Sequence, residues 1–111
     1  MKIVVSQSIV GKTQEQIEEE KSYILEKLKL KGYEVEILSS GNYKNVDEII
    51  LKLSKDLEII SKADTVAFET DWADSEICRL EYAILSMCGK EKTFLIRKDE
   101  TDKEELWKRK Y

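Results

Sequence analysis

Two carboxylates, Glu81 and Asp56, are the residues of this chain best placed for chemistry. The segment from Ser75 to Cys88 has helical spacing, and at about 100° per residue Glu81 falls within its apolar face. That face also holds Ile77, Leu80, Ile84, Leu85, Met87 and Cys88, whereas Glu76, Arg79, Tyr82, Ser86 and Lys90 lie opposite. A carboxylate facing a core is costly unless it is neutralised, hydrogen-bonded or aimed into a pocket. Periodicity alone makes Glu81 a candidate functional residue.

Asp56 lies at the border of a second apolar stripe, between Leu53 and Leu57. On this pattern alone we expect an exposed helix aspartate, because a border position does not require burial. The chain contains no histidine. A catalytic base in this protein is therefore a carboxylate, a lysine, a tyrosine or a thiolate.

The segment from Ser6 to Thr13 ends like a phosphate-binding P-loop, with the sequence Ser-Gln-Ser-Ile-Val-Gly-Lys-Thr. It has serine where the first glycine is required, which argues against a nucleoside triphosphatase. The loop follows a predicted strand and enters a predicted helix. Its amides and Lys12 therefore fit a single phosphate at the helix N-terminus. The alternative is a plain turn with a solvated lysine.

An acidic cluster follows the third predicted strand, with residue types that bind Mg²⁺: Glu69, Asp71, Asp74 and Glu76. Metal sites of the receiver or nuclease type also need acids at the end of the first strand, and this chain has none there. The sequence therefore predicts neither a metal nor a cofactor. Cys78 and Cys88 lie ten positions apart on one predicted helix, about 15 Å in rise, which is too far for a disulfide. We expect both to be small buried hydrophobic side chains.

Composition indicates one domain spanning residues 1–111. The chain is 41% hydrophobic and 38% charged, and its net charge is -4. No basic stripe attracts a nucleic-acid backbone, so a nucleic-acid polymer is not an expected partner. No apolar run has the length of a membrane span, and the N-terminus lacks the apolar core of a signal peptide. We expect a cytoplasmic protein without membrane contact.

Strand and helix patterns alternate along the whole chain. The predicted strands are 2–6, 33–38, 65–68 and 93–96. The predicted helices are 13–31, 46–63 and 75–88. We also expect a short C-terminal helix in which Leu106 and Trp107 pack back onto the body of the protein. This order predicts an α/β fold, a single-domain three-layer α/β/α sandwich around a parallel sheet of four to five strands, with strand 33–38 at an edge. Ligands of such sheets bind beyond the carboxyl ends of the strands. The loops after strands one and three should therefore meet at one site, which Glu81 can reach.

Three motifs in this order resemble the nucleoside 2-deoxyribosyltransferase superfamily. They are the segment from Ser6 to Lys12 after strand one, the run from Lys55 to Asp64 containing Asp56, and the run from Trp72 to Ala83 containing Glu81. The resemblance covers residues 1 to about 97. It is closest in style to small phage and bacterial members and to the related 2'-deoxynucleoside 5'-monophosphate N-glycosidases.

The resemblance implies a flavodoxin-like sheet and a glutamate nucleophile that attacks the anomeric carbon of a nucleoside. Glu81 matches that glutamate, and Asp56 matches the aspartate that assists departure of the base. The implied substrate-binding residues are Ser6, Ser8, Ile9, Gly11, Lys12, Trp72, Ser75 and Ile77, with Ser75 matching a serine that binds the 5'-phosphate. A glycosidic bond breaks through an oxocarbenium-like state, which a carboxylate can stabilise or trap. The implied partners are a small-molecule nucleoside or nucleotide and further copies of the chain, because neighbouring subunits often complete these sites.

Two alternatives remain open. Ile77 stands where the family usually has glycine, Val4 stands where many members have tyrosine, and the segment 39–45 is short for a substrate cover. These departures favour a non-catalytic module that senses or sequesters a nucleotide-derived molecule. The other alternative is a partner-binding domain in which Glu81 merely pairs with a cation such as Arg97 or Arg79, although Arg79 points away on a helix.

Overall fold

The α/β architecture follows from short β-branched runs alternating with capped amphipathic helices. The computed structural model describes residues 1–95 and the backbone of residues 107–109. Its elements are β1 (Lys2–Ser8), α1 (Gln14–Leu30), β2 (Glu34–Ser40), α2 (Val46–Ile60), β3 (Thr65–Phe68), the 3-10 helix η1 (Trp72–Asp74), α3 (Glu76–Cys88), β4 (Lys92–Leu95) and β5 (Trp107–Arg109). The predicted α/β sandwich is therefore confirmed.

The sheet has the strand order β2-β1-β3-β4-β5, and β1 to β4 are mutually parallel. Strand β2 lies at one edge, as its alternating pattern predicts. Strand β5 pairs antiparallel with β4, so the predicted C-terminal helix is wrong for residues 107–109. An edge strand leaves a row of backbone groups unpaired, and pairing with a second strand satisfies them. Leu106 and Ile96 lie outside the described residues.

Local signals set the helix boundaries. Thr13 begins α1 with a capping box in which its side chain accepts from the Gln16 amide and the Gln16 side chain accepts from the Thr13 amide. Ser75 accepts from the Cys78 amide at the start of α3, and Gly89 ends that helix at φ 77°. Positive φ favours glycine because it has no Cβ.

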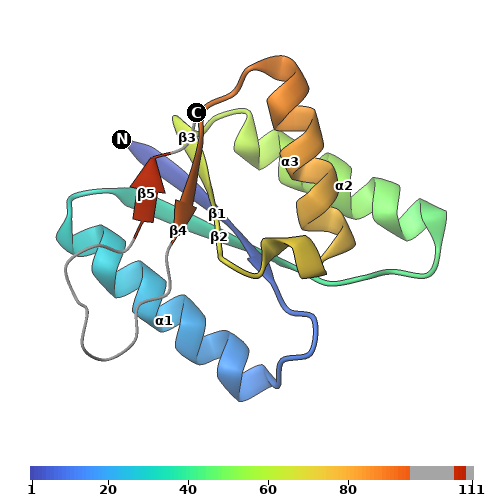
Figure 1. Cartoon of the computed structure of the whole chain (residues 1–111), viewed down its shortest axis with the longest axis horizontal. Helices are drawn as coiled ribbons and strands as arrows, with labels where there is room; N and C mark the ends of the chain where they lie inside the picture. The colour runs from blue at the N-terminus through green and yellow to red at the C-terminus, as the bar shows by residue number, and fades with distance from the viewer. Residues whose placement is uncertain (96–106, 110–111) are drawn as a thin grey trace.

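Helices cover both faces of the sheet, with α1 on one side and α2 and α3 on the other (Figure 1). Ile3 and Val5 of β1 pack with Ile24 and Leu28 of α1. Val4 points to the opposite face and belongs to a cluster that includes Phe68 and Leu85 and contacts Trp72, Tyr82 and Phe94. Burial of β1 on both faces explains its uninterrupted apolar run. None of the described helices has the length and apolarity required to cross a membrane.

The buried face of α3 differs from the predicted one. Ile77, Cys78, Glu81 and Leu85 are buried, as predicted, but Leu80, Met87 and Cys88 are exposed. Tyr82, which we expected on the wet side, packs against the core. The helix is apolar on two faces, and contact with the sheet selects the face centred near Glu81. This rotation places Glu81 in the middle of the packed surface.

Candidate active site

Strand alternation sends Ser6 and Gln7 to opposite faces of the sheet at the carboxyl end of β1. Ser6 lies on the side of Val4, beneath α2 and α3, and Gln7 lies on the side of Val5, beneath α1. Both side chains are fully buried. Each begins a separate polar cluster, so the predicted site residues fall into two groups.

The first group joins the two candidate catalytic carboxylates. Glu81 has 0% exposed surface and Asp56 has 2%. The Ser6 hydroxyl donates to Glu81 Oε1 at 2.6 Å, and a side-chain hydrogen bond links Glu81 to Asp56. The structure therefore brings together Glu81, Asp56 and Ser6 from three elements that are distant in sequence.

Two carboxyl groups in contact within a core cannot both be ionised at low cost. Burial, followed by the hydrogen bond and negative charge of Asp56, raises the pKa of Glu81 from 4.5 to about 8. The hydrogen bond from Ser6 and the positive charge of Lys52 oppose this rise. Lys52 Nζ lies 3.0 Å from Asp56 Oδ1, one helical turn away. Glu81 is therefore protonated at neutral pH, and its carboxyl group can donate a hydrogen bond to Asp56.

A buried thiol extends this first group towards the start of α3. Cys78 Sγ lies 3.1 Å from Ser6 Oγ and 3.9 Å from Ser40 Oγ. Burial raises the pKa of the Cys78 thiol, and Glu81, once ionised, acts in the same direction. Cys78 is therefore a neutral neighbour of Glu81 at physiological pH.

The segment that follows β2 closes over the N-terminus of α3. Asn42 Oδ1 accepts from the Glu76 amide at 2.7 Å, and the Ser75 hydroxyl donates to the Gly41 carbonyl at 3.3 Å. A Cβ on Gly41 would lie 3.2 Å from a side-chain carbon of Ile9. We call residues 41–45 the strap, because they tie β2 to the helix that carries Glu81.

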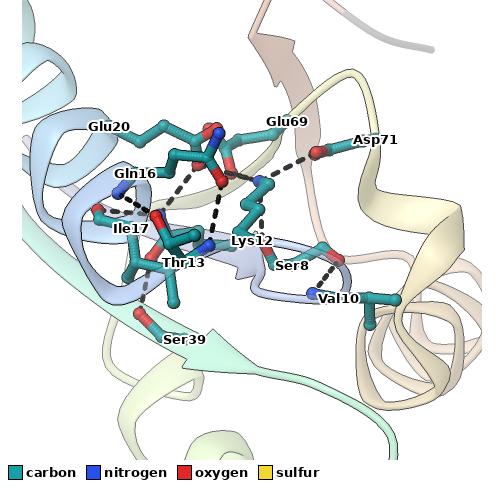
Figure 2. A network of polar contacts seen from close by, with 11 residues as sticks. Ser8, Val10, Lys12, Thr13, Gln16, Ile17, Glu20, Ser39, Glu69 and Asp71 are labelled. Carbon is teal, nitrogen blue, oxygen red and sulfur yellow. Dashed lines mark hydrogen bonds and ion pairs between the residues drawn. The ribbon is translucent and has the colours of Figure 1, made fainter.

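The second group surrounds Lys12 on the α1 side of the sheet, and Figure 2 shows its ammonium group between carboxylates from α1 and from the loop after β3. Lys12 Nζ lies 2.8 Å from Glu20 Oε1, 2.8 Å from Asp71 Oδ2 and 3.8 Å from Glu69 Oε1. It also donates to the Ser8 carbonyl at 2.7 Å. The loops after β1 and β3 therefore meet, as the topology predicts, but they meet around an ammonium ion that already has several partners.

This Lys12 cluster has more negative than positive groups. Burial lowers the pKa of Lys12, but hydrogen bonds to Asp71 and Glu20 and the charges of Glu69 and Asp71 outweigh it and raise that pKa. Gln7 Nε2 donates to Glu20 Oε1 at 2.9 Å. A phosphate approaching Lys12 would compete with these carboxylates. An open hollow of about 610 Å³ beside the cluster is lined by Val10, Gly11, Lys12, Gln16, Glu19, Glu20 and Tyr23.

The remaining predicted binding residues make hydrogen bonds, turns and packing contacts within the fold. Ser8 is buried at the end of β1 and accepts from the Val10 amide, and Ile9 donates its amide to the Ser40 carbonyl. Gly11 has a φ of 75° and is exposed in the turn. Trp72 packs 4.5 Å from the Tyr82 ring, centroid to centroid. Ile77 is fully buried in α3.

Lys52, Glu20, Gln7 and Asn42 were not among the predicted site residues. Lys52 carried a usable signal, because it precedes Asp56 by four positions on a helix. Glu20 carried one too, since it interrupts the apolar stripe of Ile17, Ile24 and Leu28 as Glu81 interrupts its own. Gln7 and Asn42 carried none, because their contacts depend on how distant elements meet.

Arg79 donates to the Ala73 carbonyl and is exposed, so it does not pair with Glu81, and Arg97 lies outside the described residues. Within residues 1–95 no group of three or more acidic or cysteine side chains is arranged to hold a metal ion. Of the acidic set considered for Mg²⁺, Glu69 and Asp71 pair with Lys12. The acids after β3 therefore hold a lysine in this structure.

No family model, no curated protein and no solved structure matches this chain.

Proposed function

We propose that this protein cleaves or transfers at the N-glycosidic bond of a nucleoside or a nucleoside 5'-monophosphate, with Glu81 as nucleophile and Asp56 as acid. The observation that carries the proposal is the pair of buried, hydrogen-bonded carboxylates at the carboxyl end of β1. One carboxylate to attack and one carboxylic acid to protonate are the two groups that glycoside chemistry requires. The resemblance of the three motifs supports the same reaction.

The pair has the correct proton count for this reaction. The proton of Glu81 moves to Asp56, which leaves Glu81 ionised as the nucleophile and Asp56 protonated as the acid. Glu81 then attacks C1', the C1'–N bond breaks, and its electron pair leaves with the base, which takes the proton from Asp56. Water next attacks C1', releases Glu81 and returns a proton to Asp56. In the transferase reaction a second base replaces water.

A substrate must separate the Glu81 and Asp56 side chains and displace the strap. Both side chains are buried and interact with each other, so an anomeric carbon can reach Glu81 only if the two side chains separate. In our proposal the strap leaves the start of α3, which breaks the contacts of Asn42 and Ser75 and frees the amides near Ser75 for a 5'-phosphate. Lys12 is the weaker phosphate ligand, because Glu20 and Asp71 already hold it.

The test is release of free base from a panel of deoxynucleosides and deoxynucleoside monophosphates. We expect activity in the native chain, and a loss of at least about a hundredfold in Glu81→Gln and Asp56→Asn. Glu58→Gln is the matched control, because Glu58 lies on α2 two residues after Asp56, on the opposite side of the helix, and is exposed. Mass spectrometry of a quenched reaction should find a deoxyribosyl adduct on Glu81. No base release by any of these proteins would refute the proposal.

A nucleotide-binding module without chemistry is the second candidate. The fully buried Ile77 favours it, since this side chain fills the helix face one turn before Glu81. In that case calorimetry would detect nucleotide binding and no base would be released. Absence of both binding and base release would exclude both candidates.

A further inference from the structure

The Ser6 hydroxyl lies within hydrogen-bond distance of two side chains of α3. Its oxygen is 2.6 Å from Glu81 Oε1 and 3.1 Å from Cys78 Sγ. A serine hydroxyl has one proton to donate and two lone pairs that accept. Ser6 can therefore donate to only one of these two groups at a time, and it must accept from the other.

The distances and the state of the thiol decide which group accepts. A separation of 2.6 Å is typical of a strong hydrogen bond from a hydroxyl to a carboxyl group, so the Ser6 proton points to Glu81 Oε1. Burial raises the pKa of the Cys78 thiol, which therefore keeps its own proton. Because a thiol is a weak donor, Cys78 donates to Ser6, and Ser6 donates to Glu81.

Burial strengthens this arrangement of donors. Ser6, Cys78 and Glu81 each have 0% exposed surface, so bulk water does not reach them. A hydrogen bond in such surroundings is stronger than the same bond in water. Ser6 belongs to β1, whereas Glu81 and Cys78 lie about one turn apart on α3. The hydroxyl therefore holds the Glu81 side chain against the sheet.

We propose that Ser6 is the positioning residue of the nucleophile. It holds Oε1 of Glu81, so that Oε2 is the oxygen that attacks C1', and Cys78 orients the Ser6 hydroxyl. This inference rests on the proposed reaction at the glycosidic bond. It replaces the substrate contact that the family resemblance implies for Ser6.

The same hydrogen bond favours ionisation of the nucleophile. A hydroxyl donates more strongly to a carboxylate than to a neutral carboxyl group, because the charge strengthens the bond. In the proposed reaction Glu81 becomes ionised when its proton moves to Asp56. Ser6 therefore both orients the Glu81 carboxyl group and stabilises the form of it that attacks.

The charged and titratable groups around Glu81 come from two helices. Asp56 and Lys52 lie on α2, and Cys78 lies on α3. Burial and Asp56 raise the pKa of Glu81, whereas Ser6 and Lys52 oppose the rise. Removal of the Ser6 hydroxyl leaves the other groups in place. The pKa of Glu81 should therefore move upwards from its value of about 8.

A carbon NMR titration of Glu81 tests the hydrogen bond without substrate. We expect a higher pKa for Glu81 in Ser6→Ala, and a value near the native one in Ser6→Thr, which keeps the hydroxyl and suits a strand. Ser39→Ala is the matched control, because Ser39 also donates from a strand to a buried side chain, but to Gln7 on the opposite face of the sheet. An unchanged Glu81 pKa in Ser6→Ala overturns the proposal.

The kinetics of base release separate positioning from substrate contact. We expect Ser6→Ala to lower kcat by roughly tenfold to a hundredfold, as for a lost hydrogen bond to a charged group, with little change in KM. Ser6→Thr should recover most of the lost kcat, and Ser39→Ala should have a kcat close to the native one. A raised KM with an unchanged kcat in Ser6→Ala would assign Ser6 to substrate contact and overturn the proposal, while the proposed reaction would stand.

Replacement of the thiol tests the second donor. Cys78→Ala should lower kcat severalfold, because Ser6 loses the group that orients it, and Cys78→Ser should lose less because it keeps a donor. A native kcat in Cys78→Ala would overturn the role of Cys78. If the native protein releases no base, the reaction itself is refuted and the positioning role falls with it. That outcome is distinct from a native protein that is active and a Ser6→Ala variant that is equally active, which refutes the role of Ser6 alone.

Discussion

Replacing Glu81 by glutamine should change how the stability of this protein depends on pH. Burial and the neighbouring Asp56 raise the pKa of Glu81 from 4.5 to about 8. Between these values the folded protein keeps a proton that the unfolded chain releases. Since the unfolded state then binds fewer protons, the free energy of unfolding falls as pH rises, by up to about 1.4 kcal/mol per pH unit. The loss is complete above pH 8, at most roughly 5 kcal/mol, and absent below pH 4.5.

Glutamine keeps the shape of this side chain without the ionisation. Its carbonyl can accept from Ser6 and its amide can donate to Asp56, as protonated Glu81 does. We therefore expect Glu81→Gln and the native protein to have similar stability at pH 4.5, and the variant to be more stable by several kcal/mol near pH 8.

The assay is urea unfolding followed by circular dichroism across this pH range. Glu58→Gln changes an exposed glutamate. A plot of its free energy of unfolding against pH should run parallel to that of the native protein. The reasoning is wrong if the Glu81→Gln curve is also parallel, since Glu81 would then titrate alike in the folded and unfolded states. A companion carbon NMR titration should show a higher pKa for Glu81 in Lys52→Met, because the positive charge of Lys52 opposes the rise.

Three further outcomes follow from the two clusters. Lys12→Met should destabilise the protein by about 3 to 5 kcal/mol at neutral pH in urea unfolding, because it removes the cation that pairs with buried carboxylates. Lys21→Met, which removes an exposed ion pair, should cost less than about 1 kcal/mol. Equal losses of stability in the two variants would contradict the role of Lys12. In the folded protein iodoacetamide should label Cys88 and spare Cys78, which is buried and has a raised pKa. Mass spectrometry should count one adduct on the folded protein and two on the protein unfolded in urea. Two adducts on the folded protein would show that Cys78 is accessible. If base release occurs, its rate should fall above about pH 8, where Glu81 loses its proton. A rate that keeps rising would mean that this proton is not used.

Much of the fold could be predicted because its signals are local. The β-branched run of β1, the capping box at Thr13 and the glycine at position 89 each act through neighbouring residues. Together they give the order of strands and helices, and the parallel arrangement follows from that order. The C-terminal strand β5 could not be predicted, because three residues form a strand only where an edge such as β4 accepts them.

The candidate site was predictable in part for the same reason. Glu81 interrupts a helical stripe, and that interruption is visible in the sequence. The rotation of α3 was not visible, because the helix is apolar on two faces and only the sheet decides which one is buried. Asp56 has the pattern of an exposed residue and is buried because α2 meets α3 at that point.

The α/β class, the helix ends and the anomalous position of Glu81 can be read from the sequence, since these depend on spacing and on contacts within a few residues. Which groups share a site depends instead on how the helices pack on the sheet. The tertiary structure separated Lys12 from Glu81, because neighbouring residues of β1 point to opposite faces of the sheet. It also joined Glu81 to Asp56, and this contact, together with burial, raises the pKa of Glu81.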